Sequence, residues 1–191
     1  MAIEIELKFA AEESAFEGLM AESTDWTRYE MATTYYDTPD AQLGALRWTL
    51  RRRFENGVSV CTVKTPRKDD GRNEFEVECG DIHEAIPQLM AMGAPKELGV
   101  YAAAGIEEVC AARFVRMAGK ILLDGAEAEL ALDKGELLGG GKALPFVEVE
   151  VEMKSGDLDA VKAYAAVLAE RFNLRPESKS KYKRALMLAG K

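Results

Sequence analysis

Histidine and cysteine are scarce in this sequence, whose 191 residues include one histidine, His83, and three cysteines. The cysteines, at positions 61, 79 and 110, are odd in number and far apart, so they indicate neither a set of disulfides nor the close ligand pairs of a zinc site. We interpret them as reduced thiols in the interior, and His83 as a structural residue beside a helix start. The chain therefore has almost no ligands for zinc.

Long apolar runs are also lacking, and so is an excess of basic residues. No stretch approaches the length of a membrane span, and the N-terminal segment has an acid where a signal peptide would have basic and then apolar residues. The net charge of −8 argues against a nucleic-acid-binding surface but allows a local basic pocket. We therefore expect a cytoplasmic protein with no membrane or nucleic-acid partner. Its length and 48% hydrophobic content predict a single domain, 1–191, with a sizeable core.

Two segments, 3–9 and 148–154, alternate strictly between charged and apolar residues. In a β-strand, alternate side chains point to opposite faces, so the charged residues of each segment share one face. These residues are Glu4, Glu6 and Lys8 in the first segment and Glu148, Glu150 and Glu152 in the second. Neighbouring carboxylates on such a face lie about 6.6 Å apart and repel by about 2.5 kcal/mol at an effective dielectric near 20. The face is either exposed to water, where the repulsion is small, or it binds a cation that needs oxygen ligands.

Basic residues are concentrated on three strands predicted in the first half. Strands at 49–54 and 58–65 flank the hairpin signal Asn56-Gly57, and a third strand follows the short loop 66–71. Alternation places these charged residues on one face of their strands: Arg51, Arg53, Lys64, Arg72, Glu74 and Glu76. Asp37, at the end of an earlier strand and before Thr38-Pro39, either stabilises a turn or belongs to a site.

The remaining elements are predicted from local signals. Helices are expected at 11–23 and after the N-cap residues Asp81 and Asp157. In the second half, Arg113 and Arg116 are expected to precede a strand at 120–123, and a strand at 127–133 is expected to lie between turns at 124–125 and 134–135. The glycines 139–141 form a flexible connection, and the tail 178–184 is strongly basic.

The charged faces are sorted by sign. The charged faces of the segments 3–9 and 148–154 are almost purely acidic. The charged residues expected on the other strands and in the tail are mainly basic: Arg51, Arg53, Lys64, Arg72, Arg116 and Lys181. A face open to water does not need this separation. A site that binds a divalent cation at one end and a polyanion along the rest does need it, because an unpaired buried charge costs several kcal/mol. If the apolar faces turn outward onto helices, a closed sheet would enclose a polar lumen.

The motifs of nearly the whole chain resemble, in order, those of the CYTH superfamily, the triphosphate tunnel metalloenzymes. Residues 4–8 match the N-terminal Glu-x-Glu-x-Lys signature, and later similarities lie at 35–38, 50–53, 62–64, 72–76, 114–116, 129–135, 148–154 and 180–184. The resemblance implies an α+β fold, a closed tunnel of eight antiparallel β-strands with helices packed outside. It also implies an enzyme that acts on a triphosphate compound with Mg²⁺ or Mn²⁺.

Roles for single residues follow from the same resemblance. It implies that one or two metal ions are held by Glu4, Glu6, Glu148, Glu150 and Glu152. The phosphate chain would be bound by Lys8, Arg51, Arg53, Lys64, Arg72, Arg116 and Lys181. The candidate catalytic residues are Glu4, Glu6, Lys8, Glu74 and Glu76, the last two as ligands of a second metal or as groups that orient water. The roles of Asp37, Arg113, Lys120 and Asp133 stay open.

The reaction that we expect is hydrolysis of inorganic tripolyphosphate to pyrophosphate and phosphate, because the short loop at 66–71 leaves little to contact an organic group. The alternatives are a class IV adenylyl cyclase, which makes cyclic AMP and pyrophosphate from ATP, and a thiamine triphosphatase. A polyphosphate- or nucleotide-binding module without turnover and a charged sheet that simply faces water are the non-enzymatic alternatives. The small-molecule triphosphate is the expected partner, and the chain is expected to be a monomer or a homodimer.

Overall fold

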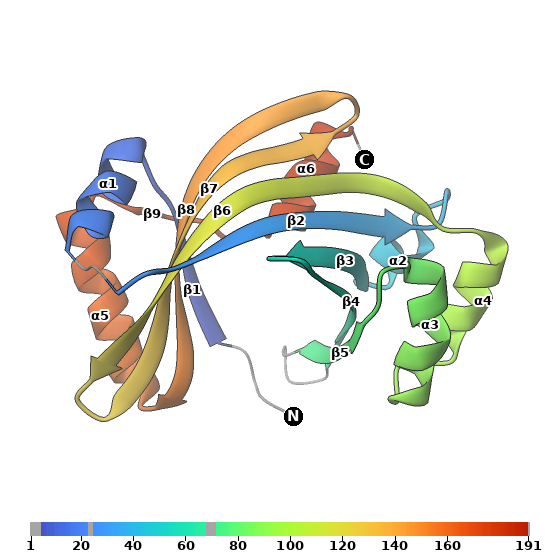
Figure 1. Ribbon diagram of the computed structural model, residues 1–191, viewed down its shortest axis with the longest axis horizontal. Helices are drawn as coiled ribbons and strands as arrows, with labels where there is room; N and C mark the ends of the chain where they lie inside the picture. The colour runs from blue at the N-terminus through green and yellow to red at the C-terminus, as the bar shows by residue number, and fades with distance from the viewer. Residues whose placement is uncertain (1–4, 23–24, 68–71, 191) are drawn as a thin grey trace.

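The computed structural model describes residues 5–22, 25–67 and 72–190. These residues form one antiparallel sheet of nine strands in the order β5-β4-β3-β2-β6-β7-β8-β1-β9. The strands are β1 Ile5–Ala10, β2 Thr27–Asp37, β3 Thr49–Glu55, β4 Val58–Pro66, β5 Arg72–Glu78, β6 Glu107–Leu123, β7 Ala126–Gly139, β8 Lys142–Gly156 and β9 Arg175–Pro176. Figure 1 shows that the sheet is strongly curved, so that it has a convex and a concave face. The fold is therefore α+β, as predicted, with eight long strands and a two-residue ninth strand that pairs with β1.

Six helices accompany the sheet in the described part of the chain. They are α1 Glu13–Ala21, α2 Gln42–Ala45, α3 Ile82–Ala91, α4 Glu97–Ala104, α5 Leu158–Arg171 and α6 Lys181–Leu188. Helices α1 and α5 lie together at one end of the sheet, and α3 and α4 lie together at the other (Figure 1). None of these helices is long and apolar enough to cross a membrane.

The apolar faces of the strands pack outward against these helices. Val149 and Val151 of β8 form one cluster with residues of α1 and α5, including Leu19 and Leu168. At the other end, Leu50 of β3 and Val63 of β4 form a second cluster with α3 and α4. The alternating sequence pattern therefore placed the apolar faces correctly, and it leaves the charged faces on the concave side.

Helix α6 is different, because it packs on the concave face. Its residue Ala185 is fully buried in a third cluster with Phe114, Leu137 and Phe146, which belong to the inner faces of β6, β7 and β8. Figure 1 shows α6 next to these strands. The basic tail therefore reaches the interior of the curved sheet as a helix.

Two helix starts were predicted correctly from their caps. The carboxylate of Asp81 accepts hydrogen bonds from the backbone N–H groups of His83 and Glu84, at 2.7 and 3.1 Å, at the start of α3. Asp157 accepts one from the N–H of Asp159 at 2.9 Å at the start of α5. Such caps satisfy backbone donors that the first helical turn leaves unpaired.

Two local predictions in the second half were wrong. Strand β6 begins at Glu107, so Arg113 and Arg116 lie within the strand rather than before it. Strand β7 also continues through 134–135, where a turn was expected. A Cβ atom at Gly135 would lie 2.1 Å from the carbonyl oxygen of Arg113, so this glycine permits a close approach of two strands. Close strand contact and a turn both favour glycine, and the sequence did not distinguish them.

The strand register brings charged residues from distant segments together. In the β1–β8 pair, Glu6 lies opposite Glu152 and Lys8 opposite Glu150. In the β7–β8 pair, Asp133 lies opposite Glu148. At the other end of the sheet, Lys64 of β4 lies opposite Glu74 of β5. The concave face is therefore acidic on one side and mainly basic on the other.

Candidate active site

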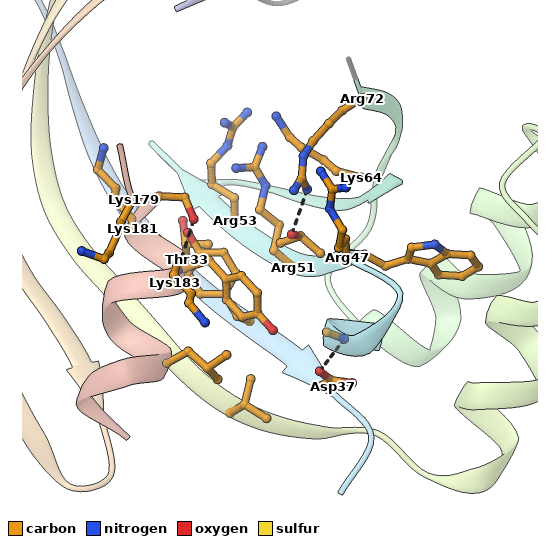
Figure 2. A pocket seen from close by; sticks show the side chains of 18 of the residues that line it. Thr33, Asp37, Arg47, Arg51, Arg53, Lys64, Arg72, Lys179, Lys181 and Lys183 are labelled. Carbon is orange, nitrogen blue, oxygen red and sulfur yellow. Dashed lines mark hydrogen bonds between the residues drawn. The ribbon is translucent and has the colours of Figure 1, made fainter. Parts of the chain in front are cut away.

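The concave face encloses a cavity of about 1130 Å³. Both ends of the sheet contribute to its lining, with Glu6 and Lys8 from β1 and Arg72 and Glu74 from β5. The predicted site residues that line it are Glu6, Lys8, Arg51, Arg53, Lys64, Arg72, Glu74, Arg116, Glu150, Glu152 and Lys181. Figure 2 shows five of the basic members extending from different elements: Arg51, Arg53, Lys64, Arg72 and Lys181. The structure thus brings most of the predicted residues into one space.

Two predicted residues lie outside the cavity lining, and a third is not among the described residues. Glu148 has no exposed surface and lies behind the cavity lining. Glu76 accepts a hydrogen bond from Thr62 Oγ1 at 2.8 Å and lies outside the lining. Glu4 falls outside the residues that the structure describes.

One side of the site, which we term the acidic wall, consists of Glu6, Asp133, Glu148, Glu150 and Glu152 on β1, β7 and β8. Lys181 lies at its centre, with its Nζ 2.8 Å from Asp133 Oδ2 and 2.7 Å from Glu150 Oε1. The same ammonium donates a hydrogen bond to Glu148. The ammonium of Lys181 therefore contacts three buried carboxylates at once.

Two arginines complete this network. Arg116 donates from Nε and Nη2 to the two carboxylate oxygens of Asp133, both at 2.7 Å, and also donates to Glu150. Arg184 of α6 donates to Glu148. The buried cluster thus contains three carboxylates and three cations, so its charges balance within the protein.

The pKa values reflect burial opposed by pairing. Burial lowers the pKa of Lys181, but Asp133, Glu150 and Glu148 raise it further, and the net shift is upward. Burial would raise the pKa of Glu150, yet Lys181 and Arg116 hold it below its usual range. For Glu148, burial dominates and the neighbouring Glu150 adds to it, so its pKa is raised. Lys181 therefore keeps its charge in the site.

Carboxylates of the acidic wall are the groups that fit a metal ion. Oxygen atoms of Asp133, Glu148 and Glu150 lie within 4.8 Å of one another, which is close enough to hold one ion. The ammonium of Lys181 contacts all three, so the chain supplies its own cation there. Glu6 and Glu152 face each other across β1 and β8, and their side chains are 38% and 29% exposed. Carboxylate oxygens of this kind suit Mg²⁺ or Mn²⁺.

The opposite side, which we term the basic wall, consists of Arg51, Arg53, Lys64 and Arg72 with Glu74 on β3, β4 and β5. Its contacts are longer than those of the buried network around Lys181: Glu74 lies 3.1 Å from Lys64 Nζ and 3.4 Å from Arg51 Nη2. The buried Nε atom of Arg51 has no hydrogen-bond partner among the described residues. Burial and the nearby Arg51 lower the pKa of Arg53. Arg53 also lies 3.3 Å from Glu55, and Arg51 lies 3.9 Å from Glu76, so the basic wall is rich in positive charge that is partly paired with acids.

The family model described as the CYTH domain matches residues 2–186. The chain belongs to the CYTH domain family. The resemblance drawn from the motifs is thereby confirmed over nearly the whole chain.

Proteins similar to this CYTH chain are described as triphosphatases or adenylyl cyclases. An inorganic triphosphatase of Haemophilus influenzae is 26% identical over 165 residues, which is 84% of this chain and 46% of the relative. The chain thus spans about half the length of this curated relative. A solved structure from Hippeastrum, described as a candidate adenylyl cyclase with a dominant triphosphatase activity, has a TM-score of 0.70 and 21% identity, covering 100% of this chain and 97% of that one. A candidate adenylate cyclase from Bacillus halodurans has a TM-score of 0.63 at 18% identity, covering 95% and 96%. At these identities the structural likeness shows the fold alone.

The residues whose roles were open are now placed in the CYTH fold. Asp37 accepts hydrogen bonds from the N–H groups of Thr38, Leu43 and Gly44 at 2.7 to 2.9 Å, so it stabilises the turn into α2. Lys120 pairs with Glu127 at 2.7 Å, is 62% exposed and lies outside the cavity lining, as does the exposed Arg113.

Three site residues of the CYTH chain were not selected from the sequence. Arg184 and Tyr182 lie on α6, and the Tyr182 ring packs against Tyr35 at 5.0 Å. A signal for this helix was present, because Ser180 is an N-cap that accepts from the N–H of Lys183 at 3.1 Å. Arg47 also lines the cavity, and no periodic pattern marked it.

Proposed function

We propose that this CYTH domain, acting as a single domain and as a monomer or homodimer, hydrolyses a linear triphosphate with the help of Mg²⁺ or Mn²⁺. The substrate that we propose is inorganic tripolyphosphate, with pyrophosphate and phosphate as products. The observation that supports this most is one cavity with accessible carboxylates on one side and a cluster of arginine and lysine side chains on the other. A bound metal–triphosphate complex has the opposite charge at each of these places.

In this proposal the basic wall binds the phosphate chain. Arg51, Arg53, Lys64 and Arg72 would contact its oxygens, with Lys8 from β1. The arginines offer paired N–H donors that match two phosphate oxygens, whereas lysine acts as a point charge. Arg116 and Lys181 also line the cavity, on the side opposite the basic wall. Their carboxylate partners would hold these two cations in position beside the phosphate chain.

The accessible part of the acidic wall would hold the metal. Glu6, Glu150 and Glu152 line the cavity, and Glu4 is the further ligand proposed from the family resemblance. Glu148 would support the site from behind by holding Lys181 and Arg184. When bound, the ion supplies neutralisation of the charge that develops on the phosphate oxygens. Glu74 would orient water, and Lys64 and Arg51 fix its position. Glu76, which lies outside the lining, would support this role from behind through its 3.9 Å contact with Arg51.

We also propose that the sheet closes around the substrate as a tunnel of eight long strands. Residues of β1 and β5, from opposite ends of the sheet, line the same cavity. Closure would exclude bulk water and strengthen every electrostatic contact with the phosphate chain.

The test is to supply tripolyphosphate, ATP and thiamine triphosphate separately with Mg²⁺ or Mn²⁺ and to measure phosphate, pyrophosphate and cyclic AMP. We expect tripolyphosphate to give phosphate and pyrophosphate in equal amounts. The names of the two structural neighbours make adenylyl cyclase the second candidate. Cyclic AMP as the main product would establish that candidate and reject the first, and tight binding without any product would indicate a binding module.

A further inference from the structure

We propose that Arg47 is a further substrate-binding residue, which binds the end of the phosphate chain at the mouth of the cavity and selects substrates whose far end is a phosphate rather than an organic group. This inference rests on the proposed function and deepens it. It starts from the backbone of Arg47, whose φ of 59° is in the left-handed region. That region favours glycine, so a long side chain kept there needs a reason other than local conformation.

The neighbouring segments hold this backbone in place. Asp37 fixes the start of α2 through the N–H groups of Leu43 and Gly44, at 2.8 and 2.9 Å. The N–H of Arg47 itself donates to the carbonyl of Gly44 at 2.9 Å. On the other side, the ring of Trp48 packs edge-on against Tyr101 with centroids 6.0 Å apart. The conformation of Arg47 is thus set from both sides, and its exposed side chain lines the cavity.

The guanidinium of Arg47 is available for a ligand. Arg47 lines the cavity, and Figure 2 shows it on the same side as Lys64 and Arg72. In the described part of the chain its side chain forms no ion pair or hydrogen bond, whereas Lys64 is paired with Glu74 at 3.1 Å. An arginine offers five N–H donors in a planar fork, which matches a terminal phosphate.

The charges near Arg47 favour an anionic end group. Arg47, Lys64 and Arg72 gather there. Among the described residues, the acids that line the same region of the cavity are Glu74, which is paired with Lys64, and Asp37 and Asp40, which accept hydrogen bonds within residues 37–44. A terminal phosphate carries between one and two negative charges at neutral pH. Adenosine is neutral and thiamine is cationic, so neither would gain from this cluster.

The decisive variant is Arg47→Gly, because it separates a binding role from a structural role. Glycine suits the left-handed backbone, so the Tm should stay the same or rise. We expect the KM for tripolyphosphate to rise about 3- to 10-fold, as for a partly exposed charged contact, with kcat within about twofold. The KM for ATP should change less, so discrimination between the two substrates should fall. The KM of Arg47→Lys for tripolyphosphate should lie between those of the wild type and Arg47→Gly.

Arg47→Gly changes a left-handed backbone position and removes a positive charge, and one control variant matches each of these two changes. Asn173→Gly replaces another left-handed residue, with φ 51°, which does not line the cavity, and it should leave KM unchanged. Arg113→Gln removes an exposed charge outside the cavity lining and should also leave KM unchanged. Binding of tripolyphosphate without divalent cation, measured by calorimetry, gives a second readout that does not need turnover.

Three outcomes would overturn the role of Arg47. If wild type binds and hydrolyses tripolyphosphate but Arg47→Gly has the same KM and Kd, Arg47 does not bind substrate, and the proposed function stands. If the Tm falls and both substrates are affected equally, Arg47 is structural. If wild type neither binds nor hydrolyses any of the triphosphates, the proposed function fails and this inference fails with it.

Discussion

The acidic and basic walls belong to one sheet and have the same alternating sequence pattern, yet their charges are arranged differently. On the acidic wall, Asp133 and Glu148 have no exposed surface, and contacts to Arg116 and Lys181 measure 2.7 to 2.8 Å. On the basic wall, Arg51 and Lys64 share Glu74 at 3.4 and 3.1 Å. The ion pairs in the core of the acidic wall are thus short and involve buried carboxylates, whereas those of the basic wall are longer and involve the more exposed Glu74.

This difference indicates that charged faces with the same pattern can serve stability in one place and binding in another. Breaking a buried ion pair leaves an uncompensated charge away from water and costs about 3–5 kcal/mol. A more exposed pair contributes about 0–1 kcal/mol. We therefore expect substitutions on the buried part of the acidic wall to affect folding, and substitutions on the basic wall to affect substrate.

The largest effect on stability is expected for Lys181→Met. Removing this ammonium leaves Asp133, Glu148 and Glu150 with two arginines, so the free energy of unfolding should fall by about 3–5 kcal/mol. Urea denaturation measures this change. Lys179→Met, which alters an exposed lysine two residues away, should change it by less than about 0.5 kcal/mol. A stable Lys181→Met protein would mean that the network does not hold α6.

Substitution of Glu152, at the accessible edge of the acidic wall, should affect activity rather than stability. Glu152→Gln should lower kcat by about 10²- to 10³-fold, as loss of a group that positions charge in the transition state does, and should raise the Mg²⁺ concentration needed for half-maximal activity. Its unfolding free energy should change by less than about 1 kcal/mol, because its partner Lys154 is 38% exposed. Glu127→Gln, which alters a partly exposed acid paired with Lys120, is the control and should keep full activity. Full activity in Glu152→Gln would remove Glu152 from the metal site.

On the basic wall, Arg51→Met should raise the KM for tripolyphosphate about 10- to 100-fold, the effect of losing a charged, paired hydrogen bond. Stability should change by about 1 kcal/mol or less, because Glu74 keeps Lys64 as a partner and repulsion with Arg53 is removed. Steady-state kinetics and urea denaturation on the same preparation separate the two effects. A large loss of stability with unchanged KM would mean that Arg51, like the buried residues of the acidic wall, stabilises the fold rather than binds substrate.

Much of this comparison could be predicted from the sequence, because alternation is a local property. The inward faces of Arg51, Lys64 and Glu150 follow from the two-residue period of a strand. The partners of these residues could not be predicted in this way. Lys181 meets Asp133 only because α6 docks on the concave face, and the sequence pattern around 181 shows basic character rather than a docking site.

Two other features depend on tertiary context. Gly135 has the sequence appearance of a turn, but its role is to let β6 and β7 approach each other. Arg47 has no periodic neighbours, and its position at the cavity mouth follows from Asp37 and Trp48 on either side. Gly135 is defined by a contact with a strand more than twenty residues away, and Arg47 by a local turn together with the packing of Trp48 on Tyr101.

The smallest effect concerns the outer side of the basic wall. Cys61 of β4 is fully buried beneath the helices at this end, and burial raises the pKa of its thiol to about 11. Because the thiolate is the reactive form, Cys61 should not react with iodoacetamide at pH 8 in the folded protein, whereas the partly exposed Cys79 should react slowly. Mass spectrometry of labelled peptides measures both rates. Equal labelling of the two thiols would mean that this wall opens readily.

The proposed triphosphatase site is tested most directly by ³¹P NMR of tripolyphosphate incubated with the protein, once with Mg²⁺ and once with EDTA. We expect the signal of the middle phosphate to disappear with Mg²⁺ and to be replaced by pyrophosphate and phosphate in equal amounts, with no change in EDTA. An unchanged spectrum with Mg²⁺, from protein that is folded by circular dichroism, would contradict the claim that the two walls together form a triphosphatase site.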